Sequence, residues 1–222
     1  MAGMKVILFG ATGMVGQAVL GECLRDGGID AVLAIGRSPT GRSDPKLREL
    51  VRTDLFDTAV PDAELQGYDA CFFCLGVSSA GMAEAEYTRL TYELTLAWAR
   101  VLARIDPDLA FLYVSGAGTG GKSMWAQVKG RTEAALRGLF PAAYMVRLAM
   151  LRPVHGEVSK TRWTRIAYGV FGPIAPLVEA LAPSVVITTE ELGRAMIRAA
   201  RERPPTHVLE MRDLQALGRA AR

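Results

Sequence analysis

Short apolar runs, each ending in glycine or a polar turn, alternate with longer segments of helical periodicity along most of this chain. The apolar runs are "KVILF" (5–9), "AVLAI" (31–35), "LRELVRTD" (47–54), "DACFFCLG" (69–76), "LAFLYVS" (109–115) and "AAYMVRLA" (142–149). A run without strict apolar–polar alternation is typical of a strand covered on both faces, as in a parallel sheet with helices on each side. The repeated strand–helix order therefore predicts an α/β fold, a doubly wound parallel sheet.

Helices are expected from about Met14 to Arg25, from about Ala83 to Ile105, and over "MWAQVKGRTEAALRGL". The C-terminal third departs from this rhythm, because prolines at 153, 173, 176 and 183 are too many for one uninterrupted helix. We expect residues 150–188 to form a small cap of loops and short helices on the substrate side. "TTEELGRAMIRAARERPP" should then form a helix with Thr188 or Thr189 as its N-cap, and "THVLEM" a last strand. All of 1–222 is expected to be one domain.

Composition argues against several classes of function. Charged residues make up 22% of the chain and the net charge is only +3, which does not favour a nucleic-acid partner. A solvated helix face accounts for the arginines near the C-terminus, Arg212, Arg219 and Arg222. No run reaches the ~18 apolar residues that span a bilayer, and no signal peptide is visible. We therefore expect a cytoplasmic protein without membrane partners.

Two of the cysteines, Cys71 and Cys74, form a C-x-x-C pair inside the apolar run "YDACFFCLG". Residues three apart on a strand point to opposite faces of the sheet. These two thiols therefore cannot share a metal ion or form a disulfide without distortion. We expect them to pack in the core, and we expect no metal site.

The first apolar run leads directly into "GATGMVG", which spaces Gly10, Gly13 and Gly16 at intervals of three. Gly10 allows a sharp turn out of the strand, Gly13 allows the backbone to approach a pyrophosphate, and Gly16 allows close packing of the following helix. The amides of Met14 and Val15 and the positive end of the helix dipole would then face the anion. Thr12 can add a hydroxyl. The spacing predicts a dinucleotide-binding turn.

The residue after the second strand indicates which dinucleotide is bound. An acidic residue there would bind the ribose 2′-hydroxyl of NAD, whereas an arginine favours the 2′-phosphate of NADP. Asp30 precedes the strand and so lies at the wrong end of the sheet, while Arg37 and Ser38 follow it, with Arg42 nearby. A guanidinium forms bidentate hydrogen bonds with phosphate oxygens. We therefore expect NADP, although Arg37 could also be an ordinary surface charge.

Three further loops at the same edge of the sheet are expected to contact this cofactor. They contribute Asp54 and Leu55 after the third strand, Leu75, Gly76 and Val77 after the fourth, and Leu148 and Met150 after the sixth. An adenine ring would lie near Asp54 and Leu55, and close approach to a ribose would require a small residue such as Gly76.

Taken together, "LFGATGMVG", "GRS", "FCLGVS" and "YVSGAG…WAQVKG" resemble the atypical short-chain dehydrogenase/reductase family. Within it, the chain looks most like the Tat-interacting oxidoreductase-like proteins and their bacterial relatives. The resemblance implies a Rossmann-type domain with NADPH along the carboxyl ends of the strands. It also implies that Ser115 orients a substrate carbonyl and that Lys129 binds the nicotinamide ribose.

The chain departs from that family at Trp125, which occupies the position of the proton-donating tyrosine. An indole N–H donates hydrogen bonds but does not ionise, so it cannot replace a general acid. A second departure is "RLAML" after the sixth strand, where the family tends to have Pro-Gly.

No other side chain has enough support from the sequence to be named as the acid. Tyr113 is expected in the core, and Tyr87 and Tyr92 on a packing face of the preceding helix. Lys122 and Ser123 could reach the pocket, and His155 lies in the expected cap, where a lone histidine is usually solvated.

Three functions remain open. The first is an NADP-dependent oxidoreductase acting on an unknown carbonyl substrate through Ser115 and Lys129. The second is a non-catalytic NADPH-binding redox sensor or regulatory protein, with a protein partner or a second copy of the chain. The third is a nucleotide-sugar epimerase or dehydratase, which is disfavoured because such enzymes normally use the missing tyrosine.

Overall fold

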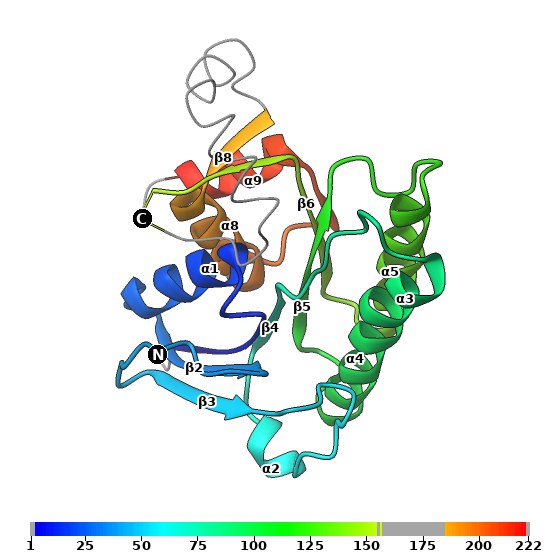
Figure 1. Ribbon diagram of the computed structural model, residues 1–222. Helices are drawn as coiled ribbons and strands as arrows, with labels where there is room; N and C mark the ends of the chain where they lie inside the picture. Colours follow the sequence, from blue (N-terminus) through cyan, green and yellow to red (C-terminus); the bar gives the residue numbers. More distant parts are fainter. Residues whose placement is uncertain (1–2, 155, 157–184, 221–222) are drawn as a thin grey trace.

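The computed structural model describes residues 3–154, 156 and 185–220. Its central sheet has the strand order β3-β2-β1-β4-β5-β6-β9, and every neighbouring pair is parallel (Figure 1). The strands are β1 (Met4–Phe9), β2 (Ile29–Gly36), β3 (Leu47–Val51), β4 (Ala70–Phe73), β5 (Ala110–Gly116), β6 (Ala143–Leu148) and β9 (Val208–Leu209). The doubly wound α/β fold expected from the sequence is confirmed.

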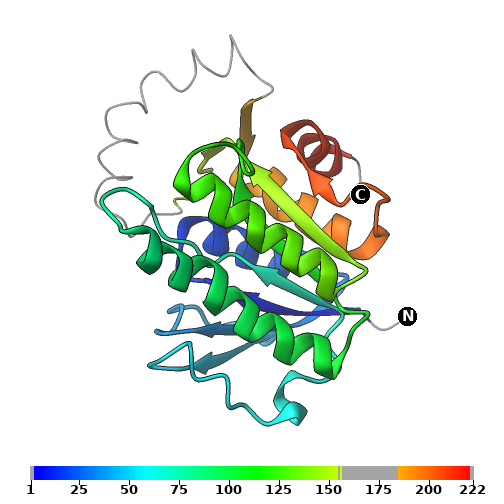
Figure 2. The ribbon, with the colours of Figure 1, turned by 90° about the vertical axis from the view of Figure 1, so that its right-hand side faces the viewer.

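Helices cover both faces of the sheet (Figure 2). One face carries α1 (Met14–Arg25), α8 (Thr189–Glu202) and α9 (Met211–Arg219). The other carries α2 (Asp62–Leu65), α4 (Leu94–Ile105) and α5 (Met124–Leu139). The continuous apolar runs of the strands are therefore explained, because successive side chains enter two different cores.

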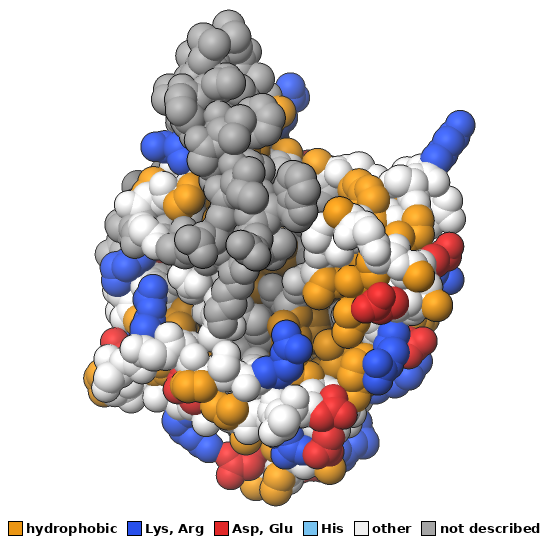
Figure 3. Space-filling view, viewed as in Figure 1, with side chains coloured by type: hydrophobic (Ala, Val, Ile, Leu, Met, Phe, Trp, Pro, Cys, Tyr) orange, Lys and Arg blue, Asp and Glu red, His pale blue; other side chains and the backbone are white. Residues whose placement is uncertain are grey.

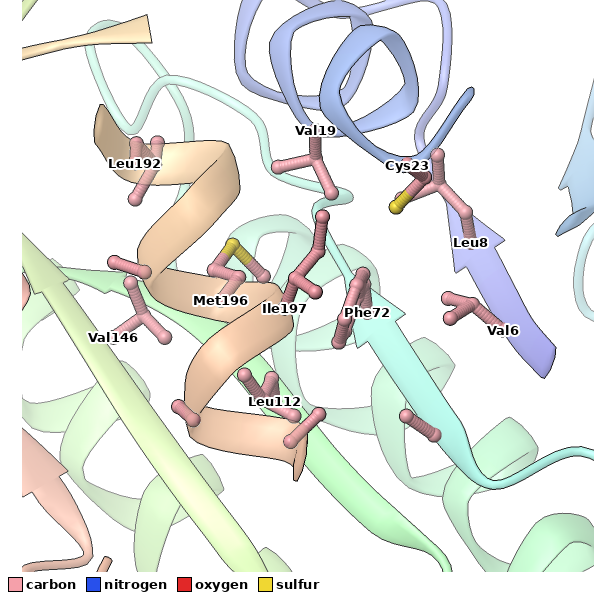
Figure 4. Packing of buried hydrophobic residues seen from close by; sticks show 14 of the residues in the cluster. Val6, Leu8, Val19, Cys23, Phe72, Leu112, Val146, Leu192, Met196 and Ile197 are labelled. Carbon is pink, nitrogen blue, oxygen red and sulfur yellow. The ribbon is translucent and has the colours of Figure 1, made fainter. Parts of the chain in front are cut away.

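The strand β1 shows this division. Val6 and Leu8 pack with Val19 and Cys23 of α1 and with α8 (Figure 4). Ile7 and Phe9 point the other way, and the ring of Phe9 contacts that of Trp98 on α4. Alternate residues of one apolar run thus stabilise opposite layers through burial of apolar surface.

The same alternation separates the two cysteines of the C-x-x-C pair. Cys71 belongs to the core under α4, whereas Cys74, just beyond β4, packs against the core under α1 and α8. Both are free thiols, and burial raises the pKa of each well above its usual value. The expectation of packing residues on opposite faces is confirmed.

The segment expected to be one helix over 83–105 is helical, with an irregular middle. It consists of α3 (Glu84–Thr88), a π-helical turn η1 (Arg89–Glu93) and α4. A π-helical turn inserts one extra residue and is often found near functional sites.

The C-terminal end confirms one expectation and corrects another. Thr188 caps α8, since its hydroxyl accepts from the Glu191 N–H and the Glu191 carboxylate accepts from the Thr188 N–H, a capping box. The last strand is shorter than "THVLEM", because Met211 begins α9. Asp213 accepts from the Glu210 N–H at 2.9 Å, and this second box ends the strand at that point. β4 likewise ends at Phe73 rather than extending to Gly76.

A separate pair of short parallel strands, β7 (Met150–Arg152) and β8 (Val186–Thr188), brings the two ends of the expected cap together. Most of that cap, including His155, lies outside the described residues, so its expected loops and short helices stay a prediction. Within the ranges that the structure describes, no helix is long and apolar enough to cross a membrane.

Candidate functional site

The carboxyl ends of β1 and β4 meet in the middle of the sheet, where the direction of winding reverses. In open α/β sheets this position is the usual place for a ligand. Gly10 leaves β1 there with φ +78°, and a Cβ on it would lie 2.8 Å from the carbonyl carbon of Cys74. Its expected role as the residue of the sharp turn is confirmed.

The other two glycines of the turn have different surroundings. A Cβ at Gly16 would lie 2.0 Å from the carbonyl oxygen of Gly10, so only glycine allows α1 to pack on the turn. Among the described residues, a Cβ at Gly13 would meet only the carbonyl oxygen of Gly10, at 3.5 Å, which is an ordinary contact. The described residues therefore do not require glycine at 13, and this uncrowded position fits a ligand that approaches the backbone.

The first turn of α1 supplies hydrogen-bond donors at this place. The N–H of Gly13 donates to the carbonyl of Gly10 at 2.9 Å, and Gly13 is the N-cap of α1. The N–H groups of the next residues, Met14, Val15 and Gly16, belong to the first turn, whose amides have no acceptor within a helix. These amides and the helix dipole suit a phosphate group.

A cavity of about 110 Å³ lies beside the turn, over the ends of β1, β2 and β3. Gly10, Thr12, Arg37, Ser38, Leu55 and Leu75, all expected at the cofactor, line it. Arg37 and Ser38 are exposed, and Arg37 makes no ion pair with any residue that the structure describes. Glu49, on β3, also lines this cavity, and its carboxylate accepts from the N–H of Thr40 at 2.7 Å.

A second cavity, of about 290 Å³, adjoins the first and shares Arg37, Leu55 and Leu75 with it. The expected residues Asp54, Gly76 and Val77 line it as well. A Cβ at Gly76 would meet no atom of the described residues within 4 Å, so none of them crowds this glycine. Figure 3 shows hydrophobic side chains gathered on the α3 and α5 side of this face, with basic and acidic ones scattered among them.

Several lining residues of the two cavities were not expected from the sequence. They are Ala11, Ala34, Ile35, Gly36, Thr40, Glu49 and Val51 in the first cavity, and Thr53, Phe56, Arg89, Leu90 and Leu94 in the second. Thr53 and Phe56 flank the expected pair Asp54–Leu55 and could have been found by proximity. Arg89 had no such signal, because it comes from a helix distant in the sequence.

The residues expected around the nicotinamide lie outside both cavities, beyond the ends of β5 and β6. Leu148 accepts from the N–H of Ala117 through its carbonyl at 2.8 Å, and Met150 is 39% exposed on β7. Their part in cofactor binding stays a prediction.

Ser115 is buried, and its hydroxyl donates to Glu133 Oε1 at 2.6 Å. Glu133 is buried on α5 and also accepts from the guanidinium of Arg147, whose Nη2 lies 2.6 Å from Oε2. Arg147 pairs in addition with Glu210 at 3.1 Å. The serine expected to orient a substrate therefore takes part in an ion-pair network centred on the buried Glu133, which sequence spacing did not reveal.

Lys129 and Trp125 lie one helical turn apart on α5 and both face the end of β5. The Nζ of Lys129 is 3.3 Å from the carbonyl oxygen of Val114 and 5.5 Å from the ring centroid of Tyr113. Burial lowers the pKa of Lys129 to about 8, against the opposing effect of Glu133. The half-buried indole of Trp125 covers Gly116 and Gly118, since a Cβ on either would lie 3.6–3.7 Å from its ring.

Tyr113 and Tyr87 are both buried, as expected of packing residues. Burial raises the pKa of the Tyr113 hydroxyl far above its usual value, and it raises that of Tyr87 too. A phenol that is so hard to ionise is a poor acid or base near neutral pH.

Comparisons with known proteins show the fold and leave the family open. No family model matches the chain. Leucinostatins biosynthesis cluster protein T of Purpureocillium lilacinum is 28% identical over 115 residues, which cover 50% of this chain and 42% of that protein. The match thus spans less than half the length of this curated relative.

Solved structures match over most of the chain. UDP-glucuronic acid 4-epimerase of Bacillus cereus in complex with NAD has a TM-score of 0.66 at 13% identity, over 93% of this chain and 77% of that one. The enzyme WbmH of Bordetella bronchiseptica in complex with NAD+ has a TM-score of 0.64 at 18% identity, over 92% and 73%. The PhqB reductase domain of Penicillium fellutanum has a TM-score of 0.64 at 17% identity, over 92% and 66%. These similarities show that the chain has a Rossmann-like α/β fold.

Proposed function

We propose that this protein binds NADP(H) as an atypical short-chain dehydrogenase/reductase-like protein. The observation that carries the proposal is that no described residue crowds Gly13, which lies next to the first-turn amides of α1 and a cavity lined by Arg37. A glycine that its own protein does not require is best explained by a ligand that contacts its backbone. Structural similarity to proteins solved with NAD supports a dinucleotide.

In this arrangement the turn and the start of α1 bind the pyrophosphate. Arg37 and Ser38 bind the 2′ side of the adenosine ribose, and the second cavity, with Asp54 and Leu55, accepts the adenine. The nicotinamide, when bound, supplies or accepts a hydride. Lys129 would then hold its ribose through Nζ, near the end of β5.

NADP(H) is favoured over NAD(H) by the charges near Arg37. Arg37 is exposed at the end of β2, and no acidic side chain of the described part pairs with it, so a phosphate can. Glu49 is the nearby group that could instead accept a ribose hydroxyl, since its carboxylate accepts from the Thr40 N–H through Oε1 and has further acceptor positions. Both residues line the same cavity, which makes the preference directly testable.

The proposal for turnover is an oxidoreductase acting on a carbonyl compound, with Ser115 orienting the substrate. A second candidate, a non-catalytic NADPH-binding sensor or regulator, is favoured by two observations at that end of the sheet. The Ser115 hydroxyl donates to Glu133, and Trp125 offers no proton that can be exchanged near neutral pH. Binding of the cofactor is common to both candidates.

The test is a titration of the purified protein with NADPH and with NADH, followed by nicotinamide fluorescence. We expect tighter binding of NADPH, and we expect Arg37→Ala to weaken NADPH about tenfold or more while leaving NADH unchanged. Arg42→Ala is the matched control, because Arg42 is an exposed arginine of the same loop that lines neither cavity. Equal affinity for the two cofactors, or equal losses in Arg37→Ala, would overturn the NADP assignment.

A further inference from the structure

The second cavity contains an arginine that the proposed function does not use. Arg89, the first residue of η1, lines this cavity together with Arg37, although the two belong to different halves of the sheet. The guanidinium of Arg89 lies over the ring of Phe56, with its central carbon 4.5 Å from the ring centroid. Phe56 in turn follows the loop of Asp54 and Leu55.

The contact with Phe56 orients this guanidinium, and no described residue accepts a hydrogen bond from it. A stacked arginine presents its flat face to the aromatic ring and keeps its N–H groups in the plane for other partners. In the described part of the chain, the guanidinium of Arg89 makes neither an ion pair nor a hydrogen bond, and it does not pair with Glu93 four residues further on. The donors of Arg89 are therefore available to a ligand.

The charges around the cavity are unbalanced. Of the nearby arginines, Arg52 is neutralised by an ion pair with Asp57. Arg37 and Arg89 have no such partner among the described residues, and they outnumber the one described carboxylate that lines the cavity, Asp54. The described lining therefore has a net positive charge, which favours an anionic ligand over an uncharged base.

We propose that Arg89 is a second specificity-determining residue for the cofactor, which binds the ribose 2′-phosphate of NADP(H) together with Arg37. This assignment rests on the proposed NADP(H) binding. Phe56 is the positioning residue that holds the guanidinium in place. Arg89 begins the π-helical turn and lines the cavity, and Leu90 and Leu94 of the same helical segment supply apolar lining.

The experiment uses two adenosine fragments that differ in the phosphate concerned, adenosine 2′,5′-bisphosphate and 5′-AMP, with affinities measured by calorimetry on the full chain. Arg89→Ala should weaken the bisphosphate about tenfold and change 5′-AMP less than twofold. Arg89→Lys should recover part of the loss, because lysine keeps the charge but not the planar donors. Phe56→Leu should give a smaller loss in the same direction.

Arg100→Ala is the matched control, an exposed arginine on α4 that lines neither cavity, and thermal unfolding of each variant verifies that it folds. Equal losses for both fragments would mean that Arg89 contacts the adenine, and no loss for either would mean that it contacts nothing; both results overturn the assignment.

Failure of the assignment can be told apart from failure of the proposed function. If the wild type prefers the bisphosphate, and Arg37→Ala removes this preference while Arg89→Ala keeps it, the NADP proposal stands and Arg89 has no part in it. If the wild type binds both fragments equally, the NADP preference itself is wrong and the assignment of Arg89 fails with it.

Discussion

The two ends of the carboxyl edge of the sheet differ in what satisfies their polar groups. At the ends of β1, β2 and β4, no residue within the described ranges crowds Gly13 or pairs with Arg37. At the ends of β5 and β6, Ser115, Glu133 and Arg147 bind one another. The first end leaves donors and charge for a ligand, whereas the second uses its charges within the fold. The proposal of cofactor binding therefore has more support than that of turnover.

The largest expected effect comes from Gly16. Gly16→Ala places a Cβ against the carbonyl oxygen of Gly10, so α1 must move; we expect a loss of about 3 kcal/mol in the free energy of unfolding, together with loss of NADPH binding. Gly13→Ala is the matched variant and should change stability by less than about 1 kcal/mol while weakening NADPH. Urea unfolding and fluorescence titration measure the two quantities. Unchanged NADPH affinity in Gly13→Ala would contradict the assigned site.

Substitution of Glu133 tests the polar network at the ends of β5 and β6. Glu133→Ala leaves the half-buried Arg147 without its buried partner and the Ser115 hydroxyl without its acceptor. We expect a loss of about 3 kcal/mol in the free energy of unfolding, measured in urea. The control is Glu84→Ala on α3. The exposed carboxylate of Glu84 lies 3.8 Å from Arg131 of α5, the helix that also carries Glu133, and its removal should have no measurable effect. Similar losses in both variants would mean that the network has no special role in stability.

A smaller effect concerns the pH dependence of stability at Lys129. Burial lowers the pKa of Lys129 from 10.5 to about 8, so between these values the unfolded chain binds a proton that the folded protein does not. Stability from this group therefore rises with pH across that window. Lys129→Met should remove this rise, and Lys122→Met, at an exposed lysine, should keep it. Urea unfolding at several pH values between 7 and 10 measures the slope; equal slopes in wild type and Lys129→Met would contradict the burial of a charged Nζ.

The remaining prediction concerns catalysis and uses Trp125→Tyr. It introduces an ionisable hydroxyl one turn before Lys129, and a positioned general acid contributes ~10²–10⁴-fold to a rate. If the region around Ser115, at the carboxyl end of β5, can hold a substrate, the rate of NADPH-dependent reduction of a broad panel of carbonyl compounds should rise above that of the wild type. Trp125→Phe, which adds no hydroxyl, is the control. No gain with tyrosine would favour the non-catalytic regulator.

Much of the candidate cofactor site at the ends of β1, β2 and β4 could be predicted from the sequence, because its signals are local. The glycine spacing follows directly after a strand, and Arg37 and Asp54 each follow the next strands, so the parallel order alone places them at one edge. The short final strand and α9 were not predicted, because the Glu210–Asp213 capping box competes with strand formation over the same residues.

The sequence by itself determined the alternation of strands and helices and the turn of Gly10, Gly13 and Gly16, since hydrophobic periodicity and glycine spacing act within a few residues of the chain. Only the tertiary structure decided the partners of the long polar side chains. Ser115 and Arg147 find Glu133 because β5, β6 and α5 pack together, and Arg37 and Arg89 reach one cavity from separate elements. Such pairings depend on how the helices and strands pack, and no local pattern in the sequence predicts them.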